Sequence, residues 1–144
     1  MNWMLMPLQR YADFQGRSRR MEYWMFTLFI FLVFLVWGIV FAVLGGFMNY
    51  EEGGASLFSG IAGIWVVLGI LAYLAILLPS IAVQVRRFHD RDMSGWFVLL
   101  NFIPYVGGLI VFVIMLLEGT RGPNRYGPDP KDPSGSTGLE EVFN

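Results

Sequence analysis

Three long apolar runs dominate the pattern of hydrophobic and polar positions along the chain. Within residues 23–85, the only charged side chains are Glu51 and Glu52, which separate the first run from the second. The third run, residues 96–117, carries no charge. About 20 apolar residues in a helix cross a hydrocarbon core of about 30 Å, so the pattern predicts an all-α membrane protein. The predicted transmembrane helices cover residues 23–44, 61–83 and 96–117.

The third run allows two interpretations. Asn101, Pro104 and the pair Gly107 and Gly108 lie near its middle. In the first interpretation, which we favour, the run is one kinked span. In the second, residues 103–108 form a turn and the run is a re-entrant hairpin. Each half would then be too short to cross the membrane, and turned backbone at that depth must be buried in protein or wetted.

Composition leaves room for one membrane-embedded unit. Of the 144 residues, 56% are hydrophobic, and the mean hydropathy is +0.56. We expect a single domain over residues 1–130 and a flexible polar tail over residues 131–144, which is rich in Gly, Pro and Ser at its start and acidic at its end. The chain has no cysteine, so nothing points to a disulfide framework or a thiolate metal site.

Basic residues cluster at two places that orient the chain. Four arginines precede the first run, three lie between the second and third, and the loop between the first two runs has none. The positive-inside rule therefore predicts a multi-pass inner-membrane protein with a cytoplasmic N terminus. Three crossings would put the C terminus outside, although Arg121 and Arg125 closely follow the third run, so its side stays open. The Trp-, Met- and Leu-rich segment of residues 1–11 is expected to lie along the interface as an amphipathic segment.

The two basic segments also hold the candidate chemistry. In a helical first segment, Glu22 follows Arg19 by three residues and can pair with it. In the second, Asp90 can bridge back to Arg86, four residues earlier, or to Arg87. If both segments share the cytoplasmic face, we expect a network of charged hydrogen bonds between them. The proposed structural, headgroup-binding or partner-binding cluster comprises Arg17, Arg19, Arg20, Glu22, Arg86, Arg87, His89 and Asp90.

The spans themselves carry packing information and little chemistry. Gly38, Ala42 and Gly46 recur every four residues and form a predicted helix-packing face. No ionisable residue of the kind that marks an ion pathway lies inside a span. The polar side chains in or near the spans are Thr27, Tyr73, Ser80, Gln84, Asn101 and Tyr105. Hydrogen bonding between helices is the expected role of Asn101.

The sequence gives no sign of catalysis or of a cofactor. His89 is the single histidine, so we expect neither a transition-metal site nor any other cofactor. The chain has no phosphate-binding loop, nucleophile elbow or zinc-protease motif. We therefore expect a protein that is not an enzyme and that has no nucleic-acid partner.

Three ordered motifs together resemble a known family. They are FQGRSRRMEYW at residues 14–24, VRRFHD with SGW at residues 85–96, and GTRGPNRYGPDP at residues 119–130 after Pro104 and Gly107. By these motifs the chain is identified as a member of the domain of unknown function 805 family, the YhaH-type bacterial inner-membrane proteins. Phe88 departs from the leucine more common in the family. The resemblance implies a small multi-pass protein of the bacterial cytoplasmic membrane without an established activity, in which residues 119–130 are structured with the rest.

Three classes of function follow, in decreasing order of support. The first is a non-enzymatic scaffold or subunit that binds a membrane-protein partner or anionic lipid headgroups through the cytoplasmic Arg/Asp/His cluster. The second is a pore or transporter component that forms by self-association into a homo-oligomer. The third is an enzyme that acts on lipid-linked or headgroup substrates through His89 and Asp90 at the interface. The sequence names no substrate, partner or pathway.

Overall fold

The computed structural model describes residues 3–49 and 60–132, and for residues 44–49 and 60–62 it describes the helix backbone alone. The predicted polar loop with Glu51 and Glu52, and residues 133–144 of the predicted tail, lie outside this part of the chain. The elements, all helical as predicted, are α1 (Met6–Gln9), α2 (Arg20–Asn49), α3 (Gly60–Asp90), the 3₁₀ helix η1 (Gly95–Phe102) and α4 (Gly107–Leu116).

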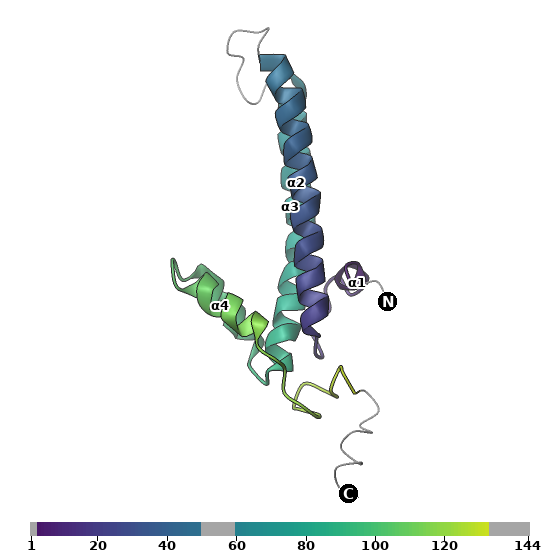
Figure 1. Cartoon of the computed structure of the whole chain (residues 1–144), viewed down its shortest axis with the longest axis vertical. Helices are drawn as coiled ribbons and strands as arrows, with labels where there is room; N and C mark the ends of the chain where they lie inside the picture. The colour runs from purple at the N-terminus through teal and green to yellow at the C-terminus, as the bar shows by residue number, and fades with distance from the viewer. Residues whose placement is uncertain (1–2, 50–59, 133–144) are drawn as a thin grey trace, which may run out of the picture.

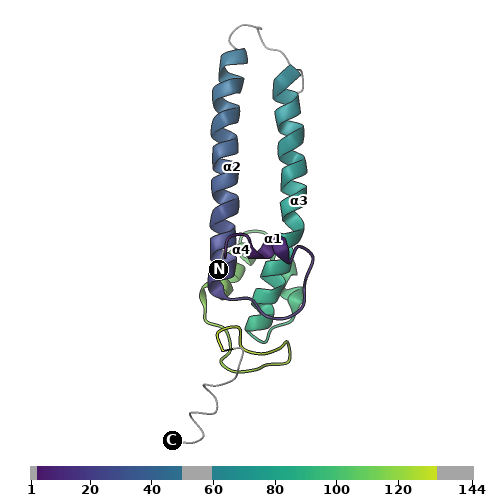
Figure 2. The same cartoon turned by 90° about the vertical axis from the view of Figure 1, so that its right-hand side faces the viewer.

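The long helices α2 and α3 form an antiparallel pair that is the axis of the molecule (Figures 1 and 2). They contain the predicted spans 23–44 and 61–83, and α3 continues past its apolar part to Asp90. The stretches Arg20–Val43 and Gly63–Asp90 have mean hydropathies of 2.8 and 2.6 and are long enough to cross a membrane. Only 6% and 17% of their apolar windows are buried, so most of this apolar surface faces outward.

The third apolar run does not form the expected single span. Residues 95–102 form η1, a turn follows, and α4 has 10 residues. An α-helix of that length extends about 15 Å, roughly half of a hydrocarbon core. The re-entrant interpretation therefore describes the run better. Ser94 caps η1, with its side chain accepting from the backbone N–H of Trp96.

Backbone chemistry explains the break. Pro104 has no N–H to continue a helical hydrogen-bond ladder, and Tyr105 has a φ of 66°, in the left-handed region. Gly107 then passes against the carbonyl oxygen of Leu100, where a Cβ atom would lie only 1.8 Å away. Any side chain at position 107 would force η1 and α4 apart, so glycine permits the tight hairpin.

The hairpin returns the chain to the end of the helix pair that it left. The α4 helix packs its Val111 and Met115 against Phe88 of α3 in a small buried core. From α2, Trp24 donates its indole N–H to the carbonyl of Met115 at 3.2 Å. Residues 118–132 consequently lie at the same end of the α2–α3 pair as the amino-terminal segment (Figures 1 and 2).

A proline in α3 helps to fix that amino-terminal segment. Pro79 lacks the N–H that would bond to the carbonyl of Ala75 four residues earlier. The hydroxyl of Tyr11 donates to this carbonyl instead. The adjoining helix α1 has only four residues, with Pro7 buried, so the predicted amphipathic segment is a short turn packed against the helix pair.

Candidate functional site

Asp90, the last residue of α3, is the centre of a buried charge cluster. Arg17 donates from Nε to Asp90 Oδ1 at 3.0 Å, and Arg87 donates from Nη1 to Oδ2. The side chains of both arginines are at most 1% exposed, and that of Asp90 is 7% exposed. A carboxylate removed from water to this degree is stable only when paired, and here each of its oxygens has a cationic partner.

A second buried pair joins α2 to α3. Arg86 Nη2 lies 3.1 Å from Glu22 Oε1, and the two side chains are 0% and 4% exposed. The two atoms are in contact without the alignment of a hydrogen bond. Close to this pair, the backbone N–H of Ser18 donates to the Arg86 carbonyl at 3.2 Å. Together the contacts bring the start of α2 against the end of α3.

The segment after α4, residues 118–132 and here called the closing segment, covers this cluster. Arg17 donates from Nη1 to the carbonyl of Gly122 at 2.6 Å, and the backbone N–H of Thr120 donates to the Asp90 carbonyl at 2.8 Å. Asn124 donates from Nδ2 to the carbonyl of His89 at 2.9 Å. A single arginine thus links the amino-terminal segment, α3 and the closing segment.

His89 is half-buried between two segments. Its Nδ1 lies 3.2 Å from the carbonyl oxygen of Gly16, and its ring stacks on Tyr126 with the centroids 3.9 Å apart. Burial lowers the pKa of His89 below its ordinary value, and the nearby Arg125 acts in the same direction, while the Gly16 carbonyl opposes the shift. The ring is therefore favoured in its neutral form, with Nδ1 protonated towards Gly16.

The remaining two arginines of the predicted cluster lie nearer the surface. Arg20 pairs with Glu118 at 2.7 Å, and both side chains are about half exposed. Arg19 donates from Nε to the carbonyl of Pro130 at 2.6 Å, and its guanidinium lies 5.5 Å from the centroid of the Trp3 ring. Through these contacts, Arg19 and Arg20 hold the start of α2 against the segment that follows α4. Both arginine side chains remain partly exposed.

The electrostatics of the buried groups reflect desolvation opposed by pairing. Burial raises the pKa of Asp90, whereas Arg87 and Arg17 act to lower it. Burial also lowers the pKa of Arg86 and Arg87, and the partner carboxylates oppose that shift. Because these charges are turned toward one another, the cluster is built to hold segments together. Among the described residues, no three His, Cys, Asp or Glu side chains are grouped so that they could hold a metal ion.

The structure brings the residues of the predicted cluster together, but some of the ion pairs differ from the predicted ones. The local pairing of Asp90 occurs with Arg87, one of the two arginines considered. Glu22 pairs with Arg86 of the other helix and not with its neighbour Arg19. Sequence reasoning did not single out Gly119, Thr120 or Asn124, and the signal that could have indicated them is the third motif.

The predicted helix-packing face is not used between α2 and α3 where the structure describes it. A Cβ atom on Gly38 would meet nothing within 4 Å, and Ala42 is exposed. Gly46 lies in the part of α2 for which only the backbone is described. By contrast, Gly69 of α3 packs against the Trp37 ring, with 3.1 Å between its Cβ position and the indole nitrogen.

Two long exposed apolar helices, with their charges gathered at one end, define a helical membrane protein. Its relationship to known proteins agrees with this class. The family described as "Protein of unknown function (DUF805)" matches residues 11–128, and the chain belongs to that family, as its three motifs indicated.

Two relatives from Escherichia coli (strain K12) cover nearly the whole chain. "Inner membrane protein YhaH" is 43% identical over 131 residues, which are 91% of this chain and 98% of that protein. "Inner membrane protein YhaI" is 40% identical over 131 residues, or 91% and 97% of the two chains. The more distant "Uncharacterized protein YiiR" is 25% identical and covers 88% of this chain and 92% of its own length. No solved structure matches the chain.

Proposed function

We propose that this protein is a non-enzymatic scaffold or subunit of the bacterial inner membrane, which crosses the membrane twice and presents its polar end to the cytoplasm. The observation that carries this proposal is the burial of the charge cluster. Arg17, Glu22, Arg86, Arg87 and Asp90 pair with one another in the interior, and Arg17 also donates to a backbone carbonyl after α4. They thereby join the amino-terminal segment, the end of α3 and the segment after α4 into one unit, here called the platform.

The charge distribution supports the orientation. All ten Lys and Arg residues of the chain lie at the platform end, where the described residues include seven Asp and Glu, leaving a net charge of +3. The segment between α2 and α3 contributes Glu51 and Glu52 and no cation. This asymmetry favours the platform on the cytoplasmic side, where anionic headgroups attract basic residues.

Two surfaces outside the buried charge cluster are available to ligands and partners. Arg19 and Arg20 stay partly exposed where the platform meets the first span, which suits an anionic headgroup. The outward apolar faces of α2 and α3 suit lipid or the helices of a membrane-protein partner. Each arginine near an anionic leaflet gains about 1 kcal/mol.

Native mass spectrometry of the protein, extracted from its own membrane in a mild detergent, tests this function. A co-extracted membrane-protein partner, or retained phosphatidylglycerol or cardiolipin, is expected. Arg19→Gln with Arg20→Gln should lower the retention of anionic lipid. The control pair Arg121→Gln and Arg125→Gln removes the same charge in the closing segment, and it should retain lipid. A bare monomer without lipid or partner would contradict the proposal.

Self-association is a second candidate, favoured by the open face at Gly38 and Ala42. Small residues that no helix of the same chain covers allow a second copy to approach closely. A pore or transporter component predicts a defined homo-oligomer in the same experiment and flux in liposomes. Gly38→Leu should then abolish the oligomer, and if it does not, this face is not the contact.

A further inference from the structure

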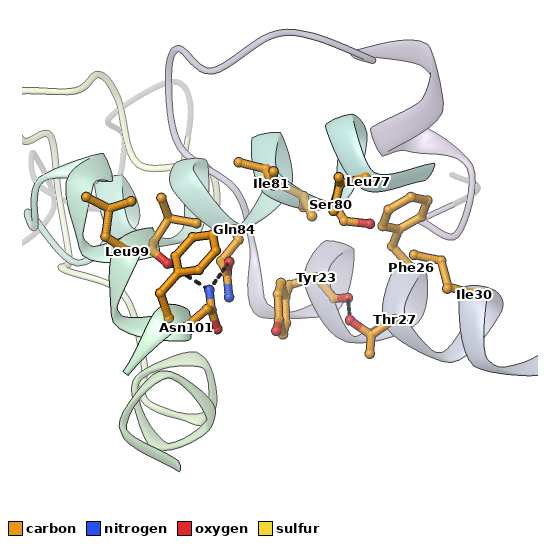
Figure 3. Close-up of a pocket in the computed structure, with 13 residues that line it drawn as sticks. Tyr23, Phe26, Thr27, Ile30, Leu77, Ser80, Ile81, Gln84, Leu99 and Asn101 are labelled. Atoms are coloured by element: carbon orange, nitrogen blue, oxygen red, sulfur yellow. Dashed lines mark hydrogen bonds between the residues drawn. The ribbon is translucent and has the colours of Figure 1, made fainter. Parts of the chain in front are cut away.

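Four polar side chains that the sequence scatters along the apolar runs meet in one cavity. Thr27 of α2, Ser80 and Gln84 of α3, and Asn101 of η1 line a space of about 500 Å³ (Figure 3). The cavity exists because the third run folds back as a hairpin and lays η1 beside the helix pair. It is separate from the buried charge cluster, which contributes no lining residue among those described.

The hydrogen bonds in this cavity leave one amide N–H of Gln84 available. Thr27 and Ser80 each donate their hydroxyl proton to a carbonyl of their own helix at 2.8 Å. Asn101 donates from Nδ2 to Gln84 Oε1 and to the Val98 carbonyl, both at 2.9 Å. The first of these bonds holds the Gln84 amide by its oxygen (Figure 3). The amide nitrogen carries two N–H donors, and the neighbouring Tyr23 hydroxyl engages one of them, which leaves the other for a ligand.

The rest of the wall sets the chemical class of the ligand. Its remaining side chains are apolar apart from the phenol of Tyr23, and they include Phe26, Ile30, Leu77, Ile81, Leu99 and Phe102. Apolar walls with a few placed amides and hydroxyls suit an aliphatic chain that carries an uncharged hydrogen-bonding group. Since the described lining residues include no Lys, Arg, Asp or Glu, a phosphate or carboxylate does not fit here.

The depth of the cavity in the membrane narrows the chemical class of the ligand further. Gln84 precedes Arg86 by two residues, and Tyr23 directly follows Glu22, so the polar part lies just inside the charged end of the molecule. The wall at Ile30 and Leu77 lies farther along the spans, towards the apolar interior. In a phospholipid leaflet, the ester groups lie just beneath the charged headgroups and the acyl chains lie deeper.

We propose that this cavity binds a diacyl phospholipid of the surrounding leaflet, with an acyl chain along Phe26 and Ile30 and an ester carbonyl that accepts from the Gln84 amide. Asn101 acts as the positioning residue, because it turns that amide towards the lipid. The inference stands apart from the proposed scaffold function, since it requires only that the protein lie in a membrane.

The test compares two phosphatidylethanolamines with the same chains, one joined by ester bonds and one by ether bonds, which lack the carbonyls. The purified full-length protein is titrated with each in detergent and examined by native mass spectrometry. A net hydrogen bond corresponds to a factor of about 2 to 10 in affinity, so the wild type should retain the diester lipid by about that factor more.

Three variants locate the effect. Gln84→Leu should abolish the preference for the ester, and Ser80→Leu should fill the cavity and weaken the retention of both lipids. Tyr73→Phe is the matched control, because Tyr73 is a polar residue of α3 that lines a different groove. It should bind as the wild type does. Thermal unfolding of each variant shows whether it is folded, and the lipid comparison on the wild type needs no variant.

Equal retention of the diester and diether lipids by the wild type would overturn the proposal. A preference for the ester that survives in a folded Gln84→Leu protein would also overturn it. Stronger retention of a free fatty acid than of either phospholipid would assign the cavity to a different ligand and equally reject a phospholipid site.

Discussion

Gly119 lies so close to Asp90 that a Cβ atom at position 119 would be 1.9 Å from the carboxylate oxygen Oδ2. Real Cβ atoms do not approach other atoms so closely. The absence of a side chain at position 119 therefore lets the closing segment cover the carboxylate that Arg17 and Arg87 hold. The third motif begins with this glycine, which gives one residue of that motif a physical reason.

Replacing Gly119 with alanine should therefore destabilise the protein. The added methyl group must displace either the carboxylate or the closing segment, at a cost of about 1–3 kcal/mol, as in other overpacked cores. Thermal unfolding in a neutral detergent measures the loss. Gly108→Ala is the control, because a Cβ atom there meets nothing within 4 Å. If both variants unfold at the same temperature, the contact with Asp90 does not require a glycine at position 119.

Asp90→Asn should be more damaging than any change at the surface of the platform. It leaves the buried guanidinium groups of Arg17 and Arg87 without a counter-charge, which typically costs about 3–5 kcal/mol. Asp92→Asn is matched in chemistry but removes an exposed pair with Arg125, worth no more than about 1 kcal/mol. Asparagine also tolerates the positive φ of 57° at position 92. Unchanged unfolding of Asp90→Asn would show that the cluster is not structural.

Acidification should destabilise the protein through His89. Burial depresses the pKa of this histidine in the folded state below 6.5, so the unfolded chain takes up the proton first as the pH falls. Stability from this group is present above pH 6.5 and is lost as the pH falls through the lower, folded-state pKa. His89→Phe keeps a ring against Tyr126 but cannot titrate. It should flatten the dependence of the unfolding temperature on pH below 6.5. A slope identical to that of the wild type would assign the effect to other groups.

The hairpin predicts that both ends of the chain lie on one side of the membrane. Because the natural chain has no cysteine, single cysteines can report the side by labelling with an impermeant maleimide. Ala12→Cys and Pro123→Cys should react in inverted vesicles, and Glu51→Cys should react only from the outer side of spheroplasts. A single span over residues 96–117 would instead place position 123 on the side of position 51.

The sequence by itself determined the membrane character of the chain, its helical class and its family. Membrane character and helical class depend on composition along a segment. The helices α2 and α3 follow the predicted spans because an apolar run of that length has few alternatives in lipid. The family rests on motifs that can be read directly from residues 14–24, 85–96 and 119–130. The gathering of charges at one end also follows from their order in the chain.

Only the tertiary structure decided how the third run folds and which charges pair. Pro104 and Gly107 mark a break in the sequence, yet a kinked span and a hairpin satisfy the same local preferences. The packing of α4 on Phe88 selects the hairpin. Likewise, helical spacing offered Glu22 its neighbour Arg19, whereas the approach of α2 to α3 supplied Arg86. The reason is physical: local spacing limits the partners a side chain can reach along its own helix, but contacts across 73 residues, such as that of Arg17 with Asp90, exist only once the segments are packed together.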